Sequence, residues 1–181
     1  GGFAIPIAQA FGAGDKKRTN HYAGNAISLT VIISLTIMSL SLFLVKPILT
    51  LLGTPKEIFH DARVYVSIIY AGAIFTTLYN VMASILRALG DSKAPLKFLT
   101  ITAFLNVFLN YFTIAILGLG VDGAAISTVL SQLVSCILCV MYIRNRKEML
   151  HITWDDFKIK KTTAVLMLKM GVPMSLQFSI T

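Results

Sequence analysis

The chain has 181 residues, of which 56% are hydrophobic and only 13% are charged, and its formal net charge is +8. A soluble domain carries roughly 25% charged residues, so this composition excludes an ordinary soluble enzyme or binding domain and indicates a chain embedded in a lipid bilayer. The basic residues lie at the ends of apolar runs, which argues against a nucleic-acid partner. The two cysteines are too few for a disulfide framework.

Four apolar runs are long enough to cross a bilayer, because a spanning helix needs about 20 mostly apolar residues. They cover residues 22–45, 62–86, 97–117 and 122–143. A partial span covers residues 1–13, and another begins near residue 163. Runs this long favour helices over barrel strands. We therefore expect an all-α, polytopic membrane protein.

Local signals predict how some of these helices begin and end. Thr54, Pro55 and Glu57 fit an N-cap, a first helical proline and a capping-box acid. The segments 10–18, AFGAGDKKR, and 87–96, RALGDSKAPL, share Ala, then Gly-Asp, then Lys. The glycine permits a tight helix exit and the aspartate can cap the next helix. Chance similarity and an internal repeat both explain so short a match.

Thirteen of the 16 Lys and Arg residues fall on one side of the predicted membrane topology. Basic loops stay in the cytoplasm, so we expect the loops near residues 14–21, 87–97 and 144–162 to be cytoplasmic. The protein is then a multi-pass protein of the cell membrane. Its positive charge reflects this topology and contact with anionic lipid.

Two motifs that suggest other chemistry have structural explanations. The glycines of residues 118–123 match G-x-G-x-x-G, the fingerprint of dinucleotide binding. However, apolar spans flank them and no acidic residue follows about 20 residues later. We therefore expect a tight turn between two spans. Cys136 and Cys139 lie on one face of an apolar helix and are expected to be buried thiols. The three histidines are scattered near span ends and predict no metal site. We therefore expect no enzyme activity.

The segment 147–161, KEMLHITWDDFKIKK, mixes apolar and charged residues. It fits an amphipathic helix on the membrane surface, and it fits a plain polar linker equally well. In both cases it is the best candidate for a boundary between two helical bundles.

Asn106 and Asn110 are two amides inside an apolar span, and residues four apart share a face of a helix. The next span carries a polar line of its own, made of Ser127, Thr128, Ser131, Gln132 and Ser135. With a rise of 1.5 Å per residue, Asn106 and Gln132 lie about 15 Å below the outer ends of their spans. These groups can join helices, at about 0.6 kcal/mol for each bond. Alternatively, they form an ion or substrate site near the midplane, where transporters place such sites.

The chain resembles the multidrug and toxic compound extrusion family over nearly its whole length. Three stretches carry the resemblance: AQAFGAGDKKR, ILRALGDSKAPL and LNVFLNYFTI…GLGVDGAAISTVLSQ. It implies part of a twelve-helix, two-bundle transporter, from about the end of helix 2 to the start of helix 7. Residues 1–143 would belong to the N-terminal six-helix bundle, without its first helix and part of its second. Residues 144–162 would be the cytoplasmic inter-bundle linker, and residues 163–181 the start of the C-terminal bundle.

The resemblance also implies a function and a site. Members export drugs and organic cations by alternating access, driven by Na⁺ or H⁺ and with no further cofactor. Many carry Asn, three apolar residues and Asp on the fifth helix, then a hydroxyl on the sixth. Asn106 and Thr128 match this pattern, whereas Asn110 stands in the Asp position. An amide oxygen can coordinate sodium but cannot take up a proton, so proton coupling does not carry over to this position.

Other polar groups in the spans are expected either to line the cavity or to join helices. They are Gln9, Asn25, Tyr79, Asn80, Gln132 and Gln177. The expected partners are the bilayer, a small organic cation or drug, and the rest of a full-length transporter. Alternative functions are a flippase for lipid-linked precursors and a non-transporting scaffold or truncated product. A flippase would need a more basic cavity than these spans offer.

Overall fold

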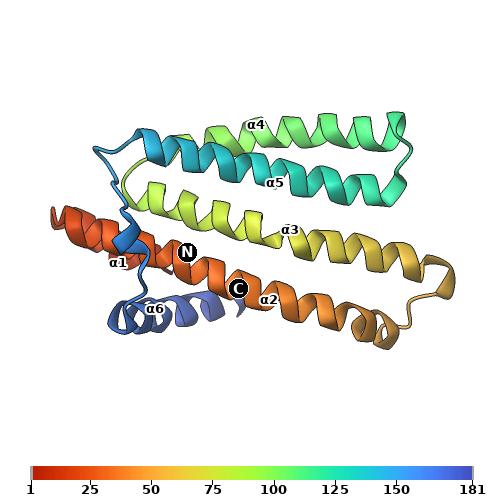
Figure 1. Ribbon diagram of the computed structural model, residues 1–181, viewed down its shortest axis with the longest axis horizontal. Helices are drawn as coiled ribbons and strands as arrows, with labels where there is room; N and C mark the ends of the chain where they lie inside the picture. Colours follow the sequence, from red (N-terminus) through yellow and green to blue (C-terminus); the bar gives the residue numbers. More distant parts are fainter. Residues whose placement is uncertain (1, 181) are drawn as a thin grey trace.

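The computed structural model describes the backbone of residues 2–180 and the side-chain surroundings of residues 2–173. This part of the chain forms six α-helices, a π-helical segment and a 3-10 turn. In chain order they are α1 (Ala4–Gly12), α2 (Lys16–Leu51), α3 (Lys56–Ala88), α4 (Lys93–Asn110), η1 (Tyr111–Ile116), α5 (Gly120–Asn145), η2 (Trp154–Phe157) and α6 (Lys161–Ile180). Figure 1 shows α2, α3, α4 and α5 lying along the long axis, each antiparallel to the helix before it in the chain.

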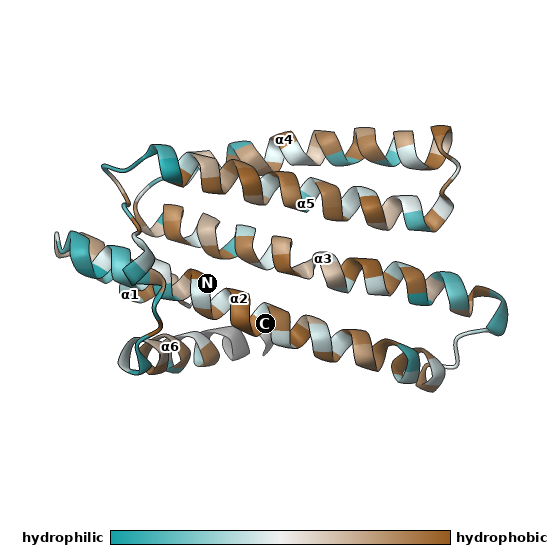
Figure 2. Cartoon of the chain, viewed as in Figure 1, coloured by the Kyte–Doolittle hydropathy of each residue, from teal (hydrophilic) through white to brown (hydrophobic). Residues whose placement is uncertain are grey.

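The four predicted spans are confirmed as helices, and each is longer than its apolar run when η1 is counted as the end of α4. Helix α2 has 36 residues and α3 has 33, because the helices continue through the charged residues that flank the apolar segments. Figure 2 shows hydrophobic residues along the middle of the bundle and hydrophilic ones toward its ends and along the linker. Large apolar side chains face outward, Phe43 and Phe104 being 83% and 74% exposed. Such a surface is suited to lipid contact.

The two similar loops have the same backbone geometry. Gly14 and Gly90 have φ angles of +73° and +87°, which glycine adopts without strain. Asp15 accepts a hydrogen bond from Arg18 N at 2.9 Å, and Asp91 accepts one from Ala94 N at 3.1 Å. The predicted glycine exits and aspartate caps are therefore confirmed.

The predicted N-cap at Thr54 is wrong. Helix α3 begins at Lys56 after Pro55, whose backbone is extended and whose side chain caps nothing. The reason is that Thr54 belongs to the end of the preceding helix, since its N–H donates to Leu49 O at 3.1 Å. Glu57 does lie in the first turn of α3, where a negative charge is favourable.

Helix α3 lies between α2 and α5 and contacts both, while α4 packs mainly against α5. The close approach of α3 and α5 requires Gly72, because a Cβ at this position would collide with the side chain of Val129. The core fills the space between α1, α2, α3, α5, α6 and the linker, and its largest fully buried side chains include Ile7, Ile85 and Leu86.

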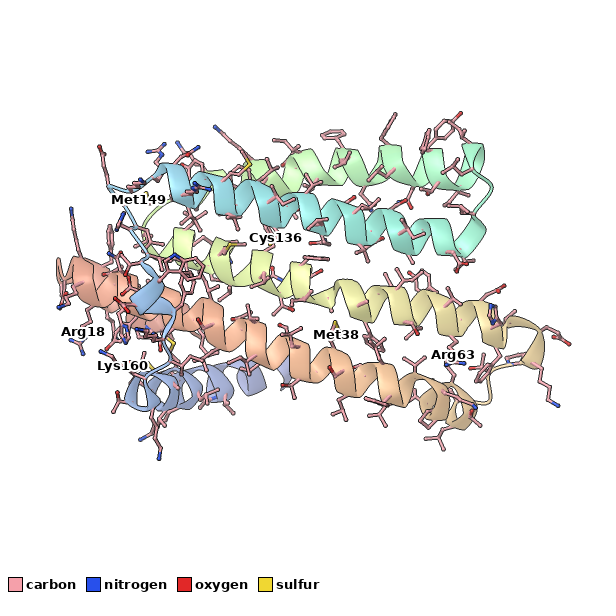
Figure 3. All side chains as sticks on the ribbon, in the orientation of Figure 1. Arg18, Met38, Arg63, Cys136, Met149 and Lys160 are labelled. Atoms are coloured by element: carbon pink, nitrogen blue, oxygen red, sulfur yellow. The ribbon has the colours of Figure 1, made fainter. Side chains whose placement is uncertain are left out.

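The segment after α5 is an ordered connector that packs along the start of α2. Across residues 146–153 the structure has no helix, so the expected amphipathic helix is wrong, and a single 3-10 turn follows at η2. Leu150 is buried at 3% exposure, which anchors the connector on the helices. Figure 3 labels Met149, Lys160 and Arg18 near one end of the bundle and Arg63 near the other.

Candidate cation-binding site

The two asparagines of α4 form a linked pair. Asn110 Nδ2 donates to Asn106 Oδ1 at 3.0 Å, one helical turn away, as their spacing predicts. The remaining oxygen, Asn110 Oδ1, is buried and has no hydrogen-bond partner among the described residues. A buried acceptor without a donor destabilises a protein by about 1–3 kcal/mol. Such an oxygen is therefore available to a ligand that carries positive charge.

The helix changes its pitch directly after this pair. The π-helical segment η1 starts at Tyr111, next to Asn110, and its wider turn appears in the bond from Leu117 N to Phe112 O at 3.0 Å. Single π-turns inside α-helices are rare and occur frequently at functional sites. The sequence offered no signal for this change, because its hydropathy pattern continues unbroken to Leu117.

Two pairs of hydroxyls join α4 and η1 to α5. Thr113 Oγ1 lies 2.8 Å from Ser127 Oγ, and Ser135 Oγ donates to Thr102 Oγ1 at 2.8 Å. Gly123 permits the first contact, because a Cβ there would lie only 3.0 Å from Thr113 Oγ1. Hydroxyls therefore hold these helices together, and the amide pair is left outside this network.

Thr128, the third expected site residue, makes no described hydrogen bond to the asparagines. Its hydroxyl donates to Ala124 O at 2.9 Å, within its own helix. Among the described hydrogen bonds, none joins Thr128 or Gln132 to Asn106 or Asn110. Both residues are half-buried on α5. The structure thus brings two of the three expected ligands together.

The other expected cavity residues have diverse surroundings. Tyr79 is buried and donates its hydroxyl to Pro95 O at 2.7 Å, which joins α3 to the first turn of α4. Gln9 and Asn80 are exposed. Asn25 is fully buried against the linker. The side chain of Gln177 lies outside the described residues.

The geometry around the other motifs favours no alternative chemistry. Gly118 and Gly120 have φ angles of +66° and +54° and form the predicted tight turn before α5. Cys136 and Cys139 are buried free thiols, as predicted. In residues 2–173, no three histidine, cysteine or acidic side chains are grouped as a metal site would require.

The fold and the polar pair define a polytopic helical membrane protein with a polar site inside its spans. The MatE family model matches residues 1–112. The chain is 30% identical to the "Probable multidrug resistance protein YoeA" of Bacillus subtilis (strain 168), over 97% of its own length and 39% of that protein. The chain belongs to the MatE family of membrane transporters.

Solved structures of the family share the fold. The chain matches an inward-facing multidrug resistance MATE family transporter of the MOP superfamily at 29% identity and a TM-score of 0.89, covering 97% of this chain and 40% of that one. It matches an outward-facing structure at 29% identity and a TM-score of 0.88, covering 97% and 39%. The chain therefore spans about two fifths of the length of these relatives.

Proposed function

We propose that the protein carrying this chain exports drugs or small organic cations from the cell by alternating access, and that inward movement of a coupling cation drives the export. Asn110 Oδ1, buried beside Asn106 and without a donor, is the observation that carries the proposal. Relatives described as multidrug resistance proteins support the substrate class. The chemistry is binding and release, with no covalent step.

The donor set fits sodium better than a proton at this site. Oxygen atoms from amides and carbonyls suit hard cations. Asn110 Oδ1 is unengaged, and Asn106 Oδ1 accepts one hydrogen bond and keeps a second lone pair. Neither amide takes up a proton near neutral pH. Thr128 on α5 lies outside this pair, since its hydroxyl bonds within its own helix. Coupling to H⁺ would require a carboxylate elsewhere.

A rigid-body movement of these helices is part of the proposal. The chain matches the inward-facing and the outward-facing structures almost equally, with TM-scores of 0.89 and 0.88. Equal similarity supports a segment whose internal packing changes little while its position relative to the rest of the transporter changes, as in alternating access. We place residues 1–143 in one bundle, residues 144–162 in a cytoplasmic linker, and residues 163–181 at the start of a second bundle.

Transport in everted membrane vesicles tests the proposal. Efflux of a fluorescent organic cation is followed after a sodium jump and, separately, after a pH jump, for wild type and Asn110→Ala. We expect a sodium-driven signal that Asn110→Ala abolishes at unchanged protein level. Asn145→Ala, which removes an exposed amide from the end of α5, is the matched control and should transport normally. A pH-driven signal indifferent to Asn110→Ala would contradict this site.

A further inference from the structure

A cavity of about 330 Å³ lies where α4 begins and α5 ends, at the opposite end of α4 from Asn106 and Asn110. Its lining is mostly charged or aromatic and includes Asp91, Lys93, Lys97, Phe98, Tyr142 and Arg146. We call it the basic cavity. Figure 1 shows that α4 begins and α5 ends at the end of the bundle where the linker starts.

The one carboxylate of the basic cavity is already engaged. Tyr142 donates its hydroxyl to Asp91 Oδ2 at 2.6 Å, and Ala94 N donates to Asp91 Oδ1 at 3.1 Å. The hydrogen bond from Tyr142 is the main reason that the pKa of Asp91 lies below its ordinary value. The carboxylate therefore stays ionised, but among the described residues no ion pair joins it to a lysine or to the arginine.

Within the part of the chain that the structure describes, none of the three cations of the basic cavity forms an ion pair, although the charge of Arg146 helps to lower the pKa of Asp91. Among the described residues the only ion pair joins Lys158 to Asp155. Lys93 and Lys97 are one turn apart on α4, so they share a face. Arg146 follows α5, and its guanidinium lies 5.3 Å from the centroid of the Tyr142 ring. The N-terminus of α4 adds further positive potential at the same place.

Aromatic packing fixes the shape of the basic cavity. Phe98 of α4 and Tyr142 of α5 meet edge to face, with their ring centroids 5.5 Å apart. The ring of Phe98 also gives the cavity an apolar wall. Charged and apolar walls side by side, at the ends of spanning helices, match a ligand with an anionic head and an apolar body.

We propose that the basic cavity binds a phosphate group, with Lys93, Lys97 and Arg146 as its ligands. A guanidinium donates to two phosphate oxygens at once, and lysine ammonium groups supply compact charge. Basic pockets between spanning helices bind phospholipid head groups in this way. The phosphate belongs to an anionic lipid or to a soluble phosphate ester. This site is independent of the transport mechanism proposed above.

Lipid binding to the purified protein tests the inference. The delipidated protein is titrated in detergent with phosphatidylglycerol or with phosphatidylcholine, and bound lipid is counted by native mass spectrometry. Each cation removed should weaken binding roughly fivefold. We therefore expect the double variant Lys97→Gln/Arg146→Gln to bind phosphatidylglycerol about 25-fold more weakly than wild type, if the two effects add. Phosphatidylcholine, whose choline offsets the phosphate charge, should bind weakly to both.

Lys17→Gln is the matched control, because Lys17 is exposed near the same end of the bundle but does not line the basic cavity. It should bind phosphatidylglycerol like wild type. Equal weakening by Lys17→Gln, or equal binding by wild type and the double variant, would overturn the inference.

Titration with glycerol 3-phosphate separates the two sources of the phosphate, an anionic lipid and a soluble phosphate ester. If glycerol 3-phosphate binds as tightly as phosphatidylglycerol, the natural ligand is a soluble phosphate ester. If it binds much more weakly, the natural ligand is the lipid. If neither compound binds, the inference fails.

Discussion

Two asparagines inside the helices, Asn25 on α2 and Asn110 on α4, have opposite surroundings. Asn25 is fully buried and makes hydrogen bonds to the linker through both ends of its amide. Its Nδ2 donates to Asp156 O at 2.9 Å, and its Oδ1 accepts from Lys160 N at 3.2 Å. The side chain of Asn110 makes one hydrogen bond, to Asn106, and its Oδ1 has no donor among the described residues.

The difference separates two uses of the same side chain. A buried amide whose hydrogen bonds are all made within the chain stabilises one arrangement, here the docking of the linker on α2. A buried amide with a spare oxygen destabilises the free protein and favours a bound cation. Composition and hydropathy do not distinguish these cases, because both asparagines lie in long helices with apolar neighbours.

Replacing Asn25 should have the largest effect on stability. Asn25→Ala removes the hydrogen bonds that hold the linker and leaves backbone groups of residues 156–160 without partners. We expect a loss of about 2–3 kcal/mol, since each buried hydrogen bond contributes about 1 kcal/mol. Thermal unfolding in detergent measures the loss, and limited proteolysis should cut the linker faster. An unchanged melting temperature and cleavage rate would show that the linker does not depend on Asn25.

Gly24→Ala should act in the same direction with a smaller effect. A Cβ at Gly24 would lie 2.5 Å from Asp156 O, so the linker backbone must move away. Overpacking of this kind destabilises by about 1–3 kcal/mol. Gly12→Ala is the matched control, because a Cβ at Gly12 meets nothing within 4 Å, and Ala is normally the better helix former. Equal effects of the two substitutions on the melting temperature would argue against a close contact at Gly24.

The smallest effect is expected where hydroxyls join α4 to α5. A double-mutant cycle of Thr113→Val and Ser127→Ala should give a coupling of about 0.6 kcal/mol, the usual value between spanning helices. Their Oγ atoms lie 2.8 Å apart. The cycle is measured by unfolding in detergent, with Thr100→Val as the control, because Thr100 bonds only within its own helix. A coupling near zero would mean that the Thr113–Ser127 pair does not help to hold these helices together.

The sequence predicted the spans well because hydropathy is a property of each segment by itself. It also predicted that Asn106 and Asn110 share a face, since this follows from the helical repeat. It did not predict that Thr113 and Ser127 join the helices while Thr128 bonds within its own, because these pairings depend on how α4 and α5 are rotated. The π-helical turn at Tyr111 and the docking of the linker on Asn25 arise from tertiary contacts, which local patterns do not encode.

The central claim is that Asn110 supplies its free oxygen to sodium. The most direct measurement is the melting temperature of the purified protein in sodium chloride and in choline chloride at equal ionic strength, for wild type, Asn110→Leu and the exposed control Asn145→Leu. Sodium at ten times its dissociation constant should stabilise wild type by about 1.4 kcal/mol. We expect Asn145→Leu to keep this shift and Asn110→Leu to lose it while remaining at least as stable as wild type in choline chloride. A sodium-dependent shift of the same size in Asn110→Leu would contradict the claim.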